Sequence, residues 1–151
     1  MTSSTSGLHR LIYLSSAVGV LRADELDRIL LRSKASNSGA GITGLLLFHE
    51  GSFLQMIEGP AAGVTSLMQK IRRDRRHSGI IMLQSSPCAE RIFPDSPLHY
   101  VAPRNLTAGE KQAFTDLRHA VQARPMLGLP MPAADIGLAA FLDSFRVVRP
   151  A

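Results

Sequence analysis

The distribution of apolar and polar residues over the first hundred positions predicts a protein of mixed strands and helices. Four runs rich in aliphatic, β-branched or aromatic residues have the length of strands: 8–15, 42–48, 53–59 and 80–84. Only a short link around Glu50 and Gly51 separates the second run from the third, which indicates an antiparallel hairpin. A fifth strand is expected near 91–101, where Pro94 and Pro97 confine it to a sheet edge or to irregular pairing.

Two amphipathic helices are expected between these strands. The first begins at about Ala23 and ends in the loop-forming segment 36–41, and its apolar stripe is Leu26, Ile29 and Leu30. The second follows Gly59 and Pro60, and its apolar face is Val64, Leu67, Met68 and Ile71. The order βαββαββ indicates the α+β class. It fits a ferredoxin-like βαββαβ sandwich with an extra edge strand and both helices on one face of the sheet.

The stretch after Pro103 has a different composition and predicts two C-terminal helices. Residues 107–110 (Thr-Ala-Gly-Glu) match a capping box at the start of the first, whose apolar side is Phe114, Leu117 and Val121. A Pro-rich linker over 124–132 precedes the second, whose apolar residues are Ile136, Ala140, Phe141 and Phe145. We therefore expect a domain over 8–101 and a helical extension over 102–151 that packs on the core or lies at a subunit interface.

Composition excludes several classes of protein. With 151 residues, of which 45% are hydrophobic, the chain can bury the core of one domain. No apolar run approaches the roughly 18 residues of a membrane span, and residues 1–7 lack the layout of a signal peptide. The single Cys88 suits a reducing compartment, so a cytoplasmic protein is expected. The five histidines are scattered without ligand spacing, so no metal site is expected.

The positive charge is concentrated in one short segment. The chain has 17 Lys and Arg against 12 Asp and Glu, a net charge of +5. Residues 70–77 hold one acidic residue, Asp74, and five basic ones, which are Lys70, Arg72, Arg73, Arg75 and Arg76. This segment therefore supplies +4 of the total of +5. It lies at the end of the second predicted helix, where the helix dipole favours cations, so part of the charge needs no ligand.

Three polar residues stand where the pattern favours apolar ones. Strand alternation puts Gln55 between Phe53 and Ile57 on one face, where a buried amide needs hydrogen-bond partners. Tyr13 shares a face with apolar residues of the first strand, and its hydroxyl also needs a partner if buried. Asn37 follows the first predicted helix. The pattern alone leaves ordinary structural roles open for all three: a solvated strand residue, a rim aromatic and a helix cap.

Five segments resemble the BLUF family, the blue-light sensors that use flavin. They are LIYLS at 11–15, N-x-x-x-GITGLLL at 37–47, G-x-FLQMIEGP at 51–60, DRRH at 74–77 and R-x-F-x-D at 91–95. Each is short, and it is their common order and spacing over 8–101 that carries the resemblance. The resemblance implies the ferredoxin-like fold predicted above, with the flavin ring inserted between the two helices.

The resemblance assigns the photochemistry to Tyr13 and Gln55. It makes Tyr13 the donor of an electron and a proton to the excited flavin, and Gln55 the hydrogen-bonded bridge between them. The Gln55 amide is then left rotated or tautomerised, which shifts the absorption of the flavin to the red. Asn37 falls on the Asn that binds the ring in this family, and an amide suits an imide edge because it both donates and accepts.

The resemblance also implies a set of cofactor-binding residues, and the sequence departs from the family pattern at Ser36, Ser96 and Leu98. The set is Asn37, Ile29, Ile71, Ser36, Phe53, Lys70, Asp74, Arg76, His77 and Leu98. Ile29 and Ile71 would enclose the ring, while Arg76 and His77, with Lys70 a turn earlier, would reach the phosphate of FAD or, alternatively, FMN. Ser96 and Leu98 replace the Trp and Met of the family, which puts the route of signal transmission in doubt. The primary photochemistry is expected to survive.

The sequence thus favours a short photoreceptor without catalytic turnover, which signals to another protein and forms a homo-oligomer. One alternative is a ferredoxin-like module that binds nucleic acid through the basic segment 70–77. The run FLQMIEG lacks the aromatic motif of such modules, so nucleic acid is not the expected partner. A second alternative, an acylphosphatase-like enzyme, lacks a recognisable phosphate-binding loop.

Overall fold

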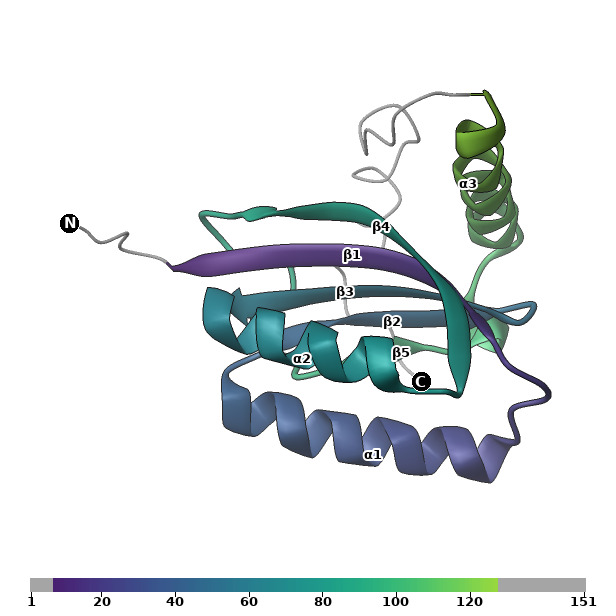
Figure 1. Cartoon of the computed structure of the whole chain (residues 1–151). Helices are drawn as coiled ribbons and strands as arrows, with labels where there is room; N and C mark the ends of the chain where they lie inside the picture. The colour runs from purple at the N-terminus through teal and green to yellow at the C-terminus, as the bar shows by residue number, and fades with distance from the viewer. Residues whose placement is uncertain (1–6, 128–151) are drawn as a thin grey trace. The chain divides into compact units, whose positions relative to one another are not determined.

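A computed structural model of the chain describes residues 7–127, and for 121–127 only the backbone. The chain divides into two units, Met1–Val101 and Ala102–Ala151. The centre of the first unit is a five-stranded sheet in the order β4-β1-β3-β2-β5, drawn in Figure 1. Its strands are β1 (Leu8–Ala17), β2 (Thr43–His49), β3 (Ser52–Pro60), β4 (His77–Pro87) and β5 (His99–Val101).

The sheet has the topology that the pattern predicted. The pairs β1–β3, β1–β4 and β2–β3 are antiparallel, whereas β5 runs parallel to β2 at one edge. Two helices, α1 (Ala23–Ala40) and α2 (Ala61–Arg73), lie on the same side of the sheet in Figure 1. The ferredoxin-like βαββαβ arrangement, the hairpin and the edge position of the fifth strand are thereby confirmed.

The first helix is longer than predicted. α1 continues through 36–40, the segment expected to be a loop, and stops at Gly41, which has φ 69°. There the Gly41 N–H faces the carbonyl oxygens of Asn37 and Ser38, a glycine cap of the kind that commonly ends helices. Asn37 therefore lies in the last turn of α1 and not beyond it. Its weak helix propensity is outweighed because its side chain is buried and hydrogen-bonded.

The strands also differ in length from the prediction. β1 continues to Ala17, beyond the predicted run 8–15. β4 begins at His77, before the predicted run 80–84. The expected fifth strand near 91–101 is reduced to three residues, 99–101. Proline lacks an N–H for a ladder, and the two prolines of this stretch leave the residues before 99 without regular pairing.

A buried carboxylate fixes this irregular stretch to the sheet. Glu58 on β3 has no exposed surface, and its oxygens accept from Nε of Arg10 at 2.8 Å and from the backbone N–H groups of Ile92 and Phe93 at 2.8 and 3.2 Å. A buried charge is tolerated only when it is paired and hydrogen-bonded, and Glu58 meets both conditions. The segment beginning at Arg91 is thus attached by a side chain where a strand ladder would otherwise do so.

Each helix packs on its own part of the sheet. Val64 and Met68 of α2 join a buried cluster with Leu11, Tyr13 and Ile57. Leu30 of α1 belongs to a second cluster, with Leu46 and Leu98. The apolar faces predicted for both helices are therefore the buried ones, and the region between the two clusters lies between the helices.

The second unit begins with a short 3-10 turn, η1 (Pro103–Asn105), and the helix α3 (Ala108–Leu127). The predicted capping box is confirmed: the Thr107 N–H donates to Glu110 Oε1 at 2.9 Å, and the Glu110 N–H donates to Thr107 Oγ1 at 3.0 Å. The helix extends over 124–127, the first part of the predicted linker. Pro125 removes one helical N–H donor there without ending the helix.

The rest of the predicted linker and the last predicted helix, with Ile136, Ala140, Phe141 and Phe145, lie outside the described residues. Within residues 7–127, no helix combines the length and the apolar character needed to cross a membrane.

Replacing Gly44 with alanine should destabilise the first unit. A Cβ on Gly44 would lie 2.0 Å from the Met56 carbonyl oxygen and 3.2 Å from the Ile57 Cα, so β2 would have to move away from β3. We expect the free energy of unfolding in urea to fall by about 1–3 kcal/mol, the usual cost of overpacking. Gly39→Ala is the matched control, because a Cβ there meets no atom within 4 Å. Equal unfolding midpoints for the two variants would show that β2 and β3 can accept a side chain at Gly44.

Candidate functional site

A cavity lies on the helix-covered side of the sheet, between α1 and α2. It holds about 630 Å³ of space, including a part open to solvent. Its lining comes from both helices, four strands, the turn after α2 and the stretch before β5: Tyr13, Ile29, Ser33, Asn37, Leu46, Phe53, Gln55, Leu67, Ile71, Asp74, Arg76, His77 and Leu98. Most of the lining surface is apolar, and the polar groups are few and localised, as is usual for a small-molecule site.

The structure brings most of the predicted site residues to this cavity. Ser36 and Lys70 are the exceptions: both are exposed, and neither is part of the lining. Ser36 precedes Asn37 by one residue, and that step turns its side chain by about 100° around the helix, away from the cavity.

Three lining residues were not predicted as site residues: Ser33, Leu46 and Leu67. Helical spacing could have indicated Ser33, because it lies four residues after Ile29 and four before Asn37. Leu46 pairs with Gln55 across β2 and β3, a register that the sequence does not give.

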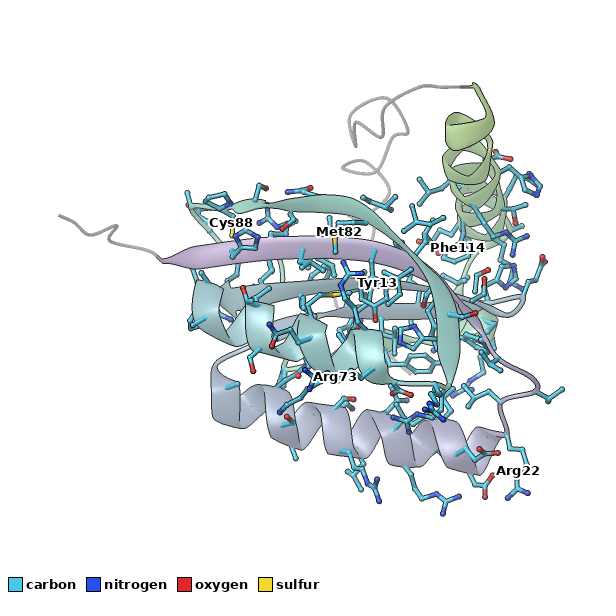
Figure 2. All side chains as sticks on the ribbon, in the orientation of Figure 1. Tyr13, Arg22, Arg73, Met82, Cys88 and Phe114 are labelled. Atoms are coloured by element: carbon cyan, nitrogen blue, oxygen red, sulfur yellow. The ribbon has the colours of Figure 1, made fainter. Side chains whose placement is uncertain are left out.

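Tyr13 and Gln55 form the central polar contact of the cavity. They are paired across the antiparallel strands β1 and β3, so their side chains leave the sheet on the same face. Both are buried, and the Tyr13 hydroxyl donates a short hydrogen bond to Oε1 of Gln55. Tyr13 lies on β1 in the middle of the sheet (Figure 2). The pairing of β1 with β4 shifts register between Ile12 and Tyr13, and such irregularities often re-aim side chains beside functional sites.

Burial raises the pKa of the Tyr13 phenol well above its ordinary value of 10, and the nearby charge of Asp74 raises it further. Asp74 is itself held ionised, because hydrogen bonds from Arg76 lower the pKa of its carboxyl group. The phenol therefore remains a proton donor over the whole physiological range of pH.

Two buried amides present unpaired atoms to the cavity. Asn37, 2% exposed, donates from Nδ2 to the carbonyl oxygen of Pro97 at 2.9 Å. Within residues 7–127, its Oδ1 and the Nε2 of Gln55 have no hydrogen-bond partner. Buried polar atoms without partners are rare and costly, so these two atoms point to a ligand with matching groups. A flat apolar ring with an edge of donors and acceptors fits this lining.

Arg76 and Asp74 form an ion pair at the mouth of the cavity. Nε of Arg76 donates to both oxygens of Asp74, at 2.9 and 3.1 Å, and its Nη2 donates to the Oδ2. The pair fixes the plane of the guanidinium and neutralises much of its charge. Arg76 therefore reaches the cavity as an oriented donor group.

His77 has a structural task in addition to lining the cavity. Its Nε2 lies 2.8 Å from the carbonyl oxygen of Ile71 and its Nδ1 lies 2.8 Å from Oγ of Ser15. Because a carbonyl can only accept, Nε2 carries a proton, and both ring nitrogens are engaged within the protein. The ring connects the end of α2 to β1 and lies near the rings of Tyr13 and Phe53, at centroid distances of 6.1 and 6.3 Å.

The Tyr13 phenol is expected to stay protonated where a free tyrosine ionises. Its folded-state pKa lies above the unfolded value, so its contribution to stability is complete below about pH 10 and is lost as the pH rises beyond it. The tyrosinate absorbance of the wild-type protein, minus that of Tyr13→Phe, should rise only together with the loss of secondary structure. The second tyrosine, Tyr100, cancels in this difference. A difference signal near pH 10 in folded protein would show that the phenol is accessible to water.

Known proteins share both the sequence pattern and the fold of this chain. The family model described as "Sensors of blue-light using FAD" matches residues 8–99. The photoactivated adenylate cyclase subunit alpha of Euglena gracilis is 37% identical over 98 residues, which cover 65% of this chain and 10% of that protein. The chain thus spans about a tenth of the length of this relative.

Two solved structures extend the comparison over nearly the whole chain. The dark-state structure of the BLUF protein BlrB has a TM-score of 0.71 at 25% identity, covering 94% of this chain and all of that one (100%). The photo-activated state of BlsA has a TM-score of 0.74 at 25% identity, covering 95% of this chain and 98% of that one. None of these comparisons supports the nucleic-acid-binding alternative.

The cofactor named in the family description agrees with the character of the cavity. Every lining residue falls within the matched range 8–99, including the hydrogen-bonded pair of Tyr13 and Gln55 and the unpaired atoms of two buried amides. The chain belongs to the BLUF family, the sensors of blue light that use FAD.

Proposed function

We propose that the cavity holds the flavin ring of FAD between Ile29 of α1 and Ile71 of α2, with Asn37 and Gln55 bonded to its polar edge. The observation that carries the proposal is the pair of unpaired buried atoms, Oδ1 of Asn37 and Nε2 of Gln55, in a mostly apolar cavity. An amide oxygen would accept from the ring imide, and an amide N–H would donate to a ring carbonyl or nitrogen. When bound, the flavin supplies the absorption of blue light.

Tyr13 and Gln55 form the proposed switch. In the present state the phenol donates to Oε1, which leaves Nε2 for the flavin. A half-turn of the amide, or its tautomerisation, exchanges the donor and acceptor sides, so that each neighbour of Gln55 meets a different group. A carboxylate could not do this, because it only accepts when ionised. The high pKa of Tyr13 keeps the proton on the phenol until light moves it.

The phosphates of FAD are assigned to a groove beside the cavity. This groove is lined by Glu25, Arg28, Ile29, Arg32 and Arg76, and it shares Ile29 and Arg76 with the cavity. Guanidinium groups suit phosphate because their planar donors can bind two oxygens at once. Arg76, whose plane is fixed by Asp74, stands where the cavity and the groove meet.

We further propose that the chain is a sensor without catalytic turnover and that its output passes to another protein. The relative from Euglena gracilis is named a photoactivated adenylate cyclase, and this chain spans a tenth of it. The stretch before β5 is the proposed route, because Pro97 accepts from Asn37, Ser96 accepts from the Gly44 N–H at 3.1 Å and Leu98 lines the cavity. Homo-oligomer formation stays a prediction of the sequence.

Purified protein should be yellow, and blue light should produce a red-shifted absorption spectrum that decays in the dark. Tyr13→Phe and Gln55→Leu should keep the flavin and lose this shift, because each removes one partner of the switch. Tyr100→Phe, which removes the other tyrosine hydroxyl, is the control and should photocycle normally. A normal red shift in Tyr13→Phe or Gln55→Leu would show that the roles are wrongly assigned. Protein that stays colourless after flavin supplementation would exclude the function itself.

Arg28→Gln, Arg32→Gln and Arg76→Gln, combined, should weaken FAD binding without weakening the binding of riboflavin, which has no phosphate. Loss of the charged contacts should lower the affinity for FAD about tenfold or more, equivalent to at least about 1.4 kcal/mol. Flavin fluorescence titrations measure both affinities. An equal loss for riboflavin would place these arginines at the ring and not at the phosphates.

A further inference from the structure

A second hollow lies at the turn between α2 and β4. It is lined by Val18, Arg72, Arg73, Asp74, Arg75, His77, Ser78, Gly79 and Ile80, and it shares only Asp74 and His77 with the flavin cavity. Arg73, labelled in Figure 2, lies in the last turn of α2. The hollow therefore adjoins the cavity at Asp74 and His77.

Three arginines of this hollow form no ion pair within the described residues. Arg72, Arg73 and Arg75 are exposed, and in the part of the chain that the structure describes none of them has a carboxylate partner. The one carboxylate of the lining, Asp74, is bonded to Arg76. At the start of α1, in contrast, the N-cap residue Arg22 is paired with Asp24 at 2.9 Å.

The helix dipole accounts for only part of this charge. Arg72 and Arg73 lie in the last turn of α2, but Arg75 follows its end. The carbonyl of Ile71 near that end already accepts from the Asp74 N–H at 3.1 Å and from Nε2 of His77 at 2.8 Å. The remaining cations favour an anionic partner from outside this turn.

Val18, which lines the hollow, and Val20, two residues further along the chain, are exposed apolar residues. Val18 is 58% exposed and Val20 is 92% exposed. The Val18 N–H donates to the carbonyl oxygen of Arg76 at 2.9 Å, which fixes the valine against the basic turn. Arginine next to exposed aliphatic carbon is a combination found at protein interfaces.

We propose that this hollow is the docking surface for an acidic segment of a partner protein. Carboxylates of the segment would bind Arg72, Arg73 and Arg75, and an apolar residue would lie on Val18 and Val20. Among the residues that line the hollow none is aromatic except His77, whose ring nitrogens are engaged, so a single strand of nucleic acid would lack a stacking platform. The proposal does not depend on flavin, because the three arginines lie outside the flavin cavity.

The test uses the full chain, with fluorescence anisotropy at low and at physiological salt. The probes are a labelled peptide of glutamates around a central leucine, the same peptide with serine in place of leucine, and a single-stranded RNA of equal charge. The variant R72Q/R73Q/R75Q removes the three charges of the hollow. The control R22Q/K34Q/R104Q removes as many exposed charges elsewhere.

The hollow variant should bind the leucine peptide about tenfold more weakly than wild type, and the control should stay within about twofold. Val18→Ser with Val20→Ser should weaken the leucine peptide and leave the serine peptide unchanged. Equal weakening by the two triple variants, or no peptide binding at low salt, would overturn the proposal. It would also be overturned if the RNA bound more tightly than the peptides and lost its binding in the hollow variant.

Discussion

The register between β1 and β3 is the constraint on which the site depends. It sets Tyr13 opposite Gln55 on the face covered by the helices. A slip of β1 by one residue would send the Tyr13 side chain to the other face and set Ile12 or Leu14 opposite Gln55. The neighbours of the pair on both strands, Ile12, Leu14, Leu54 and Met56, are buried, so a slip would also displace them from their packed positions. The position of the hydrogen-bonded pair of Tyr13 and Gln55 therefore depends on the packing of the apolar residues around it.

The stretch between β4 and β5 shows how side chains can replace a strand ladder. Glu58 holds its beginning through the backbone at Ile92 and Phe93, and Asn37 holds its end through Pro97. The first contact belongs to the buried carboxylate that pairs with Arg10, and the second lies at the cavity between α1 and α2. The stretch is thus connected to the state of the cavity at one end only.

Much of the fold and part of the site follow from the sequence. Alternation and helical spacing predicted the strands, the hairpin and the buried faces of both helices, since apolar burial dominates those choices. Alternation and helical spacing did not predict that α1 continues past Asn37. That continuation depends on a hydrogen bond from the Asn37 side chain to the carbonyl oxygen of Pro97, which is distant in sequence. The ion pair of Arg76 and the ring contacts of His77 were missed for a similar reason. Both depend on how one turn is folded, which periodicity does not describe.

The position of β1 at the centre of the sheet also constrains how the chain can fold. Its two neighbours, β3 and β4, begin at Ser52 and His77, so β1 becomes completely paired only after most of the first unit has been made. Until Pro87 has been made, at least one edge of β1 has no partner for its backbone groups. Pairings so distant in sequence are slow to form and leave apolar strands exposed meanwhile. Complete burial of β1 in the nascent chain therefore waits for the synthesis of β4.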